Sequence, residues 1–222
     1  MQEYPTTSRA FILKFRRIVI KWFRANGRNF PWRHKSNPYH LILAESLLRQ
    51  TQANRVVEPY LKLVKMYPDI KSLANASLKD LRILFQPLGL FSRADRLIDT
   101  AKTIGINHAG KVPDNLHDLL NLPGLGIYSA RAVLCLGFGR PEPLIDEGSG
   151  RVLRRVFGYI STSPAYSDRQ LLQKAKEILP PRTSREFNLG LLDIAAAYCH
   201  VQNPVCIKCP LQNICLYIKA KA

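Results

Sequence analysis

The stretch LHDLLNLPGLGIYSARAVLCLGF, residues 116–138, contains a short apolar segment, a turn with two glycines and a longer segment rich in small residues. Apolar residues recur at helical spacing on both sides of the turn, which predicts two helices joined by a tight connection. Gly124 and Gly126 can adopt a positive φ and let another backbone come close. Such a turn can present unpaired amides to a phosphate, but a plain connection between helices has the same pattern.

Helical periodicity continues on both sides of this turn, and no segment alternates as a strand would. The helix near the N-terminus has a basic face. The pattern between residues 39 and 66 predicts two helices with a break near Glu58-Pro59 or slightly earlier. We expect Ser77 to cap a helix, and Gly105 with Asn107 to end the following one. The sequence therefore predicts an all-α fold, with helical segments at residues 8–26, 39–66, 92–105, 116–120, 125–138, 151–159, 168–179 and 188–198.

The composition limits the class of protein. The chain has 222 residues, of which 33 are Lys or Arg and 16 are Asp or Glu, so its formal net charge is +17. This excess is larger than solubility requires and indicates a polyanionic partner. No apolar run approaches the roughly 18 residues of a membrane span. The N-terminal sequence Met1-Gln2-Glu3-Tyr4-Pro5 lacks the order of a signal peptide, so we expect a cytoplasmic protein, in which structural disulfides are uncommon.

Four of the five cysteines are close together in the sequence. Cys199, Cys206, Cys209 and Cys215 have the spacing C-x6-C-x2-C-x5-C. Four thiolates around a short loop suit zinc or an iron-sulfur cluster, and the spacing by itself does not separate the two. Cys135 lies apart in an apolar stretch, where we interpret it as a small core residue.

An aspartate, Asp146, follows the glycine turn by twenty residues, just before a basic helix. It can cap that helix and also present a carboxylate to a ligand. Two glycines at 148 and 150 lie in the same turn, and we expect them to loosen it unless packing compensates. The neighbouring Glu147 could compete with Asp146 for a catalytic role.

Taken in order along the chain, these motifs resemble the helix-hairpin-helix DNA glycosylases of the endonuclease III and MutY group. The resemblance covers residues 30–215, and its motifs are Phe30-Pro31-Trp32-Arg33, Glu45-x5-Thr51-Gln52, the hairpin at residues 122–126, Asp146-x4-Arg151-Val152 and the four-cysteine loop. It implies a six-helix barrel with the hairpin at residues 30–136 and a second, discontinuous domain at 1–29 and 137–222, with DNA in the cleft between them. It also favours a 4Fe-4S cluster at the cysteines over zinc.

The residue two positions after the last hairpin glycine distinguishes activities within the family, and here it is Tyr128. Enzymes that also cut the strand have a lysine there as a Schiff-base nucleophile, and a phenol cannot form that imine. We therefore expect no strong lyase activity. The combination of Tyr128 with the other motifs is most similar to the pattern of the archaeal mismatch-specific thymine/uracil DNA glycosylases.

The resemblance also implies roles for single residues. Asp146 would stabilise the positive charge that develops on the deoxyribose and position water, Glu45 would contact the leaving base, and Tyr128 would stack on it. Gln50 and Gln52 are the two candidates to fill the space left by the flipped base. The hairpin residues expected to contact the DNA backbone are Leu122, Gly124 and Gly126.

The expected function is hydrolysis of the N-glycosidic bond of thymine or uracil in G·T and G·U mismatches, as part of base excision repair. The expected partner is double-stranded DNA with a mismatched or damaged base, bound by a monomer that is associated with the nucleoid. Two alternatives remain open: an adenine glycosylase similar to MutY, and a DNA-binding module without catalysis, in which Asp146 is only a cap and Glu45 only a surface residue.

Overall fold

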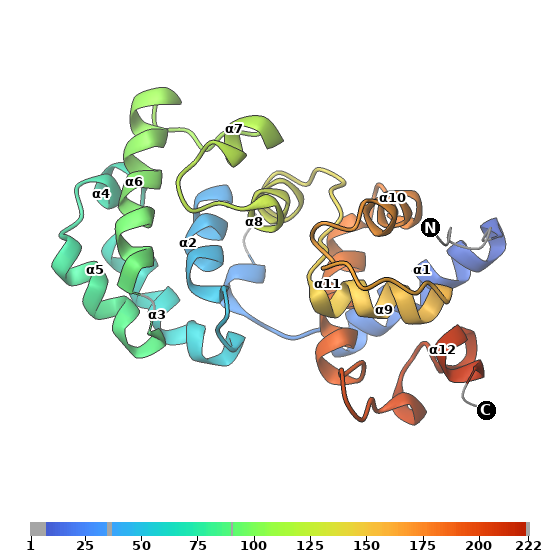
Figure 1. Cartoon of the computed structure of the whole chain (residues 1–222). Coiled ribbons are helices and arrows are strands. Elements are labelled where there is room, and N and C mark those ends of the chain that lie inside the picture. Colours follow the sequence, from blue (N-terminus) through green and yellow to red (C-terminus); the bar gives the residue numbers. More distant parts are fainter. Residues whose placement is uncertain (1–7, 35–36, 90, 221–222) are drawn as a thin grey trace. The chain divides into compact units, whose positions relative to one another are not determined.

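The computed structural model describes residues 8–34, 37–89 and 91–220 (Figure 1). Every regular element in these ranges is a helix, which confirms the all-α prediction. Residues 1–5, on which the expectation about a signal peptide rests, lie outside them. None of the helices in the described part of the chain is long and apolar enough to cross a membrane. The chain divides into two compact units, one formed by residues 29–139 and the other by residues 1–28 and 140–222.

The unit at 29–139 is built around helix α2 (Pro38–Leu48). Four consecutive residues of α2, from Leu41 to Ala44, are each at most 1% exposed, so the helix is surrounded on all sides. The other helices and helical turns of this unit are Pro31–Arg33, α3 (Ala53–Met66), α4 (Ile70–Ala74), α5 (Leu78–Phe85), Gln86–Leu88, α6 (Phe91–Asn107), α7 (Leu116–Leu120), α8 (Ile127–Ala132) and the π-helical turn Val133–Gly137.

The break between α2 and α3 lies at residues 49–52, so the prediction of a break near Pro59 was wrong. Gln50 ends the first helix with a left-handed φ of 58°. Pro59 lies inside α3, where it cannot donate an N–H bond to the preceding turn. The helix continues because Val56, Tyr60 and other residues of its apolar face are buried, and packing of such a face stabilises most helices.

Two other boundaries also differ from the prediction. Helix α6 continues through Gly105 to Asn107, because an exposed glycine inside a helix weakens it without ending it. The segment after the hairpin begins at Ile127 and changes to a π-helical turn at Val133, where Cys135 is fully buried as expected. The short helix α4 was not predicted from the sequence.

The second unit contains α1 (Arg9–Asn26), α9 (Glu147–Phe157), α10 (Arg169–Ile178), α11 (Ser184–Ala197), the short turns Cys206–Lys208 and Gln212–Ile214, and α12 (Leu216–Lys219). Its core centres on Phe15, whose ring meets those of Phe157 and Phe187 edge to face at 5.4 and 5.7 Å between centroids. In Figure 1, α1 lies beside α11, and their contact includes the ion pair of Arg24 with Glu186 at 2.9 Å. Short α12 was not predicted.

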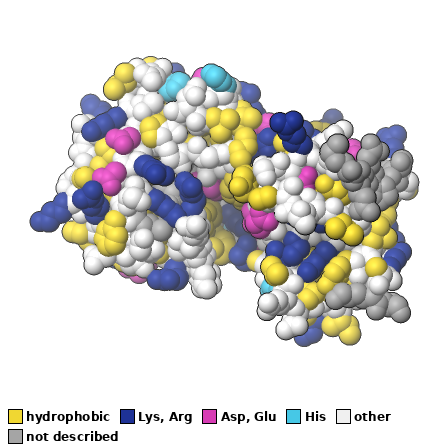
Figure 2. All heavy atoms as spheres, viewed as in Figure 1, with side chains coloured by type: hydrophobic (Ala, Val, Ile, Leu, Met, Phe, Trp, Pro, Cys, Tyr) yellow, Lys and Arg dark blue, Asp and Glu magenta, His cyan; other side chains and the backbone are white. Residues whose placement is uncertain are grey.

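The surface reflects the composition. On the face drawn in Figure 2, Lys and Arg side chains are scattered among apolar and polar side chains, while Asp and Glu are fewer.

Candidate functional site

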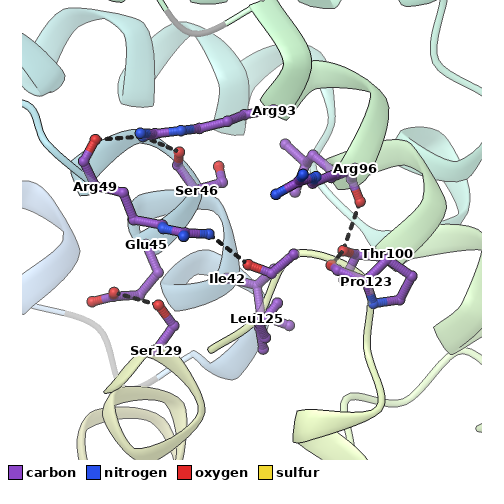
Figure 3. A pocket seen from close by; sticks show the side chains of 12 residues that line it. Ile42, Glu45, Ser46, Arg49, Arg93, Arg96, Thr100, Pro123, Leu125 and Ser129 are labelled. Atoms are coloured by element: carbon purple, nitrogen blue, oxygen red, sulfur yellow. Dashed lines mark hydrogen bonds between the residues drawn. The ribbon is translucent and has the colours of Figure 1, made fainter. Parts of the chain in front are cut away.

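A pocket opens in the unit at 29–139, between α2, α6 and the glycine hairpin (Figure 3). Its wall is a mixture of apolar groups and cationic side chains, with one carboxylate. The residues that line it are Ile42, Glu45, Ser46, Arg49, Arg93, Arg96, Leu97, Thr100, Pro123, Gly124, Leu125 and Ser129.

The carboxylate in this wall belongs to Glu45, which is 8% exposed. The Ser129 hydroxyl, from the first turn of α8, donates to Glu45 Oε2 at 3.0 Å. A glutamate on a fully surrounded helix needs such a partner, since an ionised group loses solvation when buried. The structure therefore places Glu45 away from the surface and in a pocket, where a ligand could reach it.

The hairpin at residues 122–126 forms one side of the same pocket. Leu122 is 2% exposed and anchors it, and Gly124 has φ +82°, which a residue with a side chain rarely adopts. Arg49 donates to the Gly124 carbonyl at 3.1 Å. Gly126 begins α8 without a side-chain cap, and no heavy atom would lie within 4 Å of a β-carbon there. The backbone at Gly126 is thus open to close approach, whereas a β-carbon on Gly124 would lie 3.3 Å from Arg96 Cβ.

Tyr128 is the second residue of α8 and is half-buried. It is not among the residues that line the pocket, although its neighbour Ser129 is. The structure thus brings Glu45 together with Ser129 and with the hairpin, which sequence reasoning did not pair.

The two candidate glutamines lie in the turn between α2 and α3 and are both exposed. Gln50 has the left-handed φ, and its Oε1 accepts a bond from Arg93 Nη2 at 3.4 Å. Gln52 is the N-cap residue of α3 with an ordinary φ of −64°, and its side chain makes no capping bond. Arg93 was not identified from the sequence, because it comes from α6 and no local pattern connects it with this turn.

In the other unit, Asp146 is the N-cap of α9 and forms a full capping box. Its Oδ1 accepts from the Ser149 amide at 2.6 Å and from the Ser149 hydroxyl at 2.8 Å. The side chain is exposed, and within the described part of the chain its Oδ2 has no hydrogen-bond partner. Asp146 is therefore a helix cap whose carboxylate is held in place through Oδ1.

The expectation that Gly148 and Gly150 loosen this turn was wrong. A β-carbon on Gly150 would lie 2.7 Å from Ala165 Cβ, and one on Gly148 would lie 3.1 Å from Ala195 Cβ. The glycines therefore let α9 pack closely against its neighbours. Glu147 is also exposed and is held through one oxygen, because its Oε1 accepts from the Ala165 amide at 2.8 Å.

The loop before Asp146 is held from α11. The side chain of Asn188, 2% exposed, accepts from the Leu144 amide at 3.1 Å and donates to the Glu142 carbonyl at 2.8 Å. A buried amide that satisfies two backbone groups fixes their positions. Sequence reasoning used Asn188 only as part of a motif and missed this contact.

The four clustered cysteines are free thiols in the second unit. Burial, with smaller contributions from the nearby Cys199, Cys215 and Cys206, raises the pKa of Cys209 to about 11, so the four sulfur atoms interact. Arg155 donates to Cys199 Sγ at 3.3 Å. Nevertheless, no three His, Cys, Asp or Glu side chains of the residues described are placed so that together they could hold a metal ion.

Comparison with known proteins places these features in context. Residues 43–181 match the HhH-GPD superfamily, described as base excision DNA repair proteins. A thymine-DNA glycosylase of Aeropyrum pernix is 39% identical, over 91% of this chain and 93% of that protein. A thymine/uracil-DNA glycosylase of Pyrobaculum aerophilum is 36% identical, over 94% and 93%. The solved structure of a thermostable thymine-DNA glycosylase has a TM-score of 0.89, with 31% identity and coverage of 95% of this chain and 98% of that one.

Proposed function

Because this chain belongs to the HhH-GPD superfamily of base excision DNA repair proteins, and is a DNA glycosylase, we propose that its substrate is thymine or uracil opposite guanine in double-stranded DNA. The relatives of 39% and 36% identity support this substrate. The observation that carries the hydrolysis itself is Asp146, whose carboxylate is fixed through Oδ1, while Oδ2 has no hydrogen-bond partner among the residues described. A mismatched base costs less to flip out than a paired one, which favours such substrates. The enzyme would act on the nucleoid in the cytoplasm as a monomer.

Asp146 supplies the charge for bond breaking. As the N-glycosidic bond lengthens, the deoxyribose becomes positively charged, and a carboxylate already held in place stabilises that charge without reorganising. The same oxygen can orient the water that completes hydrolysis. The capping box supports this role because it fixes the side chain to the start of a helix.

Glu45 acts on the leaving base. Its burial in the pocket wall and its bond from Ser129 favour a carboxyl group that contacts a base or protonates it, rather than a solvated surface residue. Tyr128, at the adjacent position, offers a ring for stacking and cannot form the imine of a strand-cutting lyase. The reaction therefore stops at the abasic site.

The backbone of the hairpin, with Leu122, Gly124 and Gly126, contacts the DNA backbone, and the excess of positive charge attracts the duplex. Gln50 or Gln52 fills the space left in the base stack. Both are exposed and next to the pocket residue Arg49, which supports a role at the DNA surface.

We also propose that Cys199, Cys206, Cys209 and Cys215 hold a 4Fe-4S cluster within the discontinuous second domain. None of the four thiols forms a disulfide, and the charges of neighbouring cysteines contribute to the raised pKa of Cys209 and Cys215, which supports a shared donor set. The cluster would tie this loop together. Iron and acid-labile sulfide in equal amounts, in protein purified without oxygen, would support it, whereas zinc in their place would support the alternative metal.

The activity is tested with end-labelled duplexes that contain G·T, G·U, A·8-oxoguanine or only normal pairs, each with and without hot alkali. We expect alkali-dependent cleavage only at the T or U of the G mismatches. Cleavage at adenine would instead indicate an adenine glycosylase. Binding of DNA without cleavage of any duplex would indicate a DNA-binding module without catalysis. Cleavage without alkali would contradict the assignment of Tyr128.

A further inference from the structure

The turn between α2 and α3 contains an unusual backbone conformation at an exposed residue. Gln50 has φ +58°, a region that residues with a β-carbon rarely adopt. Such conformations persist only when neighbouring groups hold them, and they occur preferentially where function requires them. The neighbouring Gln52 has an ordinary φ of −64°, so the unusual backbone singles out one of the two glutamines.

Arg93, from the first turns of α6, holds this conformation. Its Nη1 donates to the carbonyl oxygens of Ser46 and Arg49, which are left without helical partners at the end of α2 (Figure 3). Its Nη2 donates to Gln50 Oε1 at 3.4 Å. One planar guanidinium thus fixes both the end of the helix and the side chain of the glutamine, which requires the fork of an arginine.

A second arginine ties the other end of the turn. Arg55, in the first turn of α3, donates to the Pro87 carbonyl at 2.8 Å. The turn is therefore held from two sides, from α6 and from the segment between α5 and α6.

The position of Arg93 is electrostatically unfavourable. Burial lowers the pKa of its guanidinium, and the positive charges of Arg49 and Arg96 lower it further. The nearby acidic residue Asp95 pairs instead with Arg82. Placing a third cation beside Arg49 and Arg96 costs free energy through charge repulsion. A glycine or a short polar residue ends a helix without this repulsion. This cost points to a role for the geometry that Arg93 imposes.

We propose that Arg93 is a positioning residue that holds Gln50 ready to fill the space left in the base stack when the target nucleotide flips out. The inference rests on the proposed function, since only an enzyme that flips a base leaves such a space. A glutamine held in advance does not have to be ordered during flipping, so more of the complex is in the flipped state. In this role Arg93 acts through Gln50 and not through a contact with the base or the sugar, although it also lines the pocket.

The test uses a G·U duplex with 2-aminopurine beside the uracil, whose fluorescence rises when its neighbour leaves the stack. Single-turnover excision and the fluorescence change are measured for the wild-type protein and for Arg93→Ala, Arg93→Lys, Gln50→Ala and the double variant Arg93→Ala/Gln50→Ala. Arg82→Ala is the matched control, because Arg82 is an arginine of the same unit whose partner is Asp95.

We expect Arg93→Ala to lower both the excision rate and the fluorescence change on the order of tenfold, because the glutamine is no longer held in place. Gln50→Ala should have the same effect, and the double variant should lose little more, since the two residues act as one unit. Arg93→Lys keeps the charge that attracts DNA but cannot bond the Arg49 carbonyl and Gln50 Oε1 at the same time. A lower excision rate in this variant therefore measures the effect of the geometry and not of the charge. Arg82→Ala should match the wild type.

Three results would overturn the inference. The first is that Arg93→Lys and Arg93→Ala excise the base at the wild-type rate. The second is that the effects of Arg93→Ala and Gln50→Ala multiply in the double variant. The third is that excision by Arg93→Ala is slower while the fluorescence change is the same as in the wild type. Should Arg93→Ala fail to fold, Arg93→Lys with Gln50→Ala supplies the same comparison. A wild-type protein that excises no base would contradict the proposed function itself, and so is distinct from a failure of Arg93 alone.

Discussion

Helices α9 and α10 both begin at an aspartate, but the two carboxylates are used differently. Asp146 and Asp168 each accept the backbone amide three residues later, at 2.6 and 2.9 Å. The second oxygen of Asp168 is bonded to Arg154 at 2.8 Å, and the residue is 4% exposed. The second oxygen of Asp146 has no hydrogen-bond partner in the part of the chain that the structure describes, and the residue is exposed. Two aspartates at equivalent helix positions thus differ in whether the second carboxylate oxygen can contact a ligand.

The pKa of Asp168 shows that its negative charge is part of the fold. Burial raises that pKa, but the Leu171 amide and the Arg154 guanidinium outweigh burial and hold it below the ordinary value. Asp168 is therefore a structural anion. Asp146 has the same cap but no cation on its outer oxygen, and this is what a group that must stabilise a transient positive charge requires.

The largest expected effect is that of Asp146→Asn on catalysis. Asparagine is also a good N-cap, so α9 should keep its start, while the negative charge is lost. We expect base release to fall about a thousandfold, with DNA binding and thermal stability retained. Single-turnover excision and binding to the same G·T duplex measure the two properties. Normal turnover by the variant would contradict the assignment of Asp146.

Asp168→Asn should have the opposite profile. The cap survives, but Arg154 loses the carboxylate in a pair whose side chains are 16% and 2% exposed. Leaving a buried cation without its partner should cost about 3 kcal/mol of unfolding free energy. Urea denaturation measures this loss, and excision well below the melting temperature should be nearly unchanged. A variant with normal stability and impaired excision would remove the distinction between the two aspartates.

Gly150→Ala tests whether the start of α9 is tightly packed. Its new methyl group would lie 2.7 Å from Ala165 Cβ and 3.1 Å from Leu171 Cδ2, so we expect a loss of about 2 kcal/mol. Gly105→Ala is the matched control, because no heavy atom lies within 4 Å of a β-carbon there and alanine favours a helix. Equal stability of the two variants would show that the glycine turn is loose after all.

The smallest effect concerns acid stability. Because the folded-state pKa of Asp168 lies below the ordinary aspartate value of 3.8, the carboxylate stabilises the fold fully above that pH. The contribution is lost as the pH falls below about 4 and through the lower folded-state pKa. Urea denaturation at a series of pH values should therefore show a steeper acid loss for the wild type than for Asp168→Asn. Parallel curves would show that Asp168 makes no such contribution.

Local signals predicted much of the fold. Ser77 caps a helix as expected, with the Asp80 amide bonded to its hydroxyl, and residues 116–120 form α7. Prediction was wrong where distant packing decides, as at Pro59, which lies inside a helix, and at Gly148 and Gly150, which are tightly packed. A glycine in the sequence does not reveal whether its missing side chain creates freedom or close contact.

The site was predictable only in part for the same reason. Glu45 and Asp146 could be named from motifs, and their roles remain predictions. The bond from Ser129 to Glu45, across 84 positions, and that from Arg93 to Gln50, across 43, depend on how helices pack. No local pattern encodes such contacts, and the arginine in particular resembles any surface cation of an amphipathic helix.

The contact between α1 and the C-terminal part of the chain has a consequence during synthesis. Arg16 donates to the Ile178 carbonyl, 162 positions later, and Arg24 pairs with Glu186 at the same separation. At about 10 residues per second, α1 leaves the ribosome roughly 15 s before the residues that cover Phe15. The unit at 29–139 is complete in that interval and can fold first. The apolar face of a newly made α1 is therefore without the residues that cover it in the folded protein until the C-terminal part of the chain has been made.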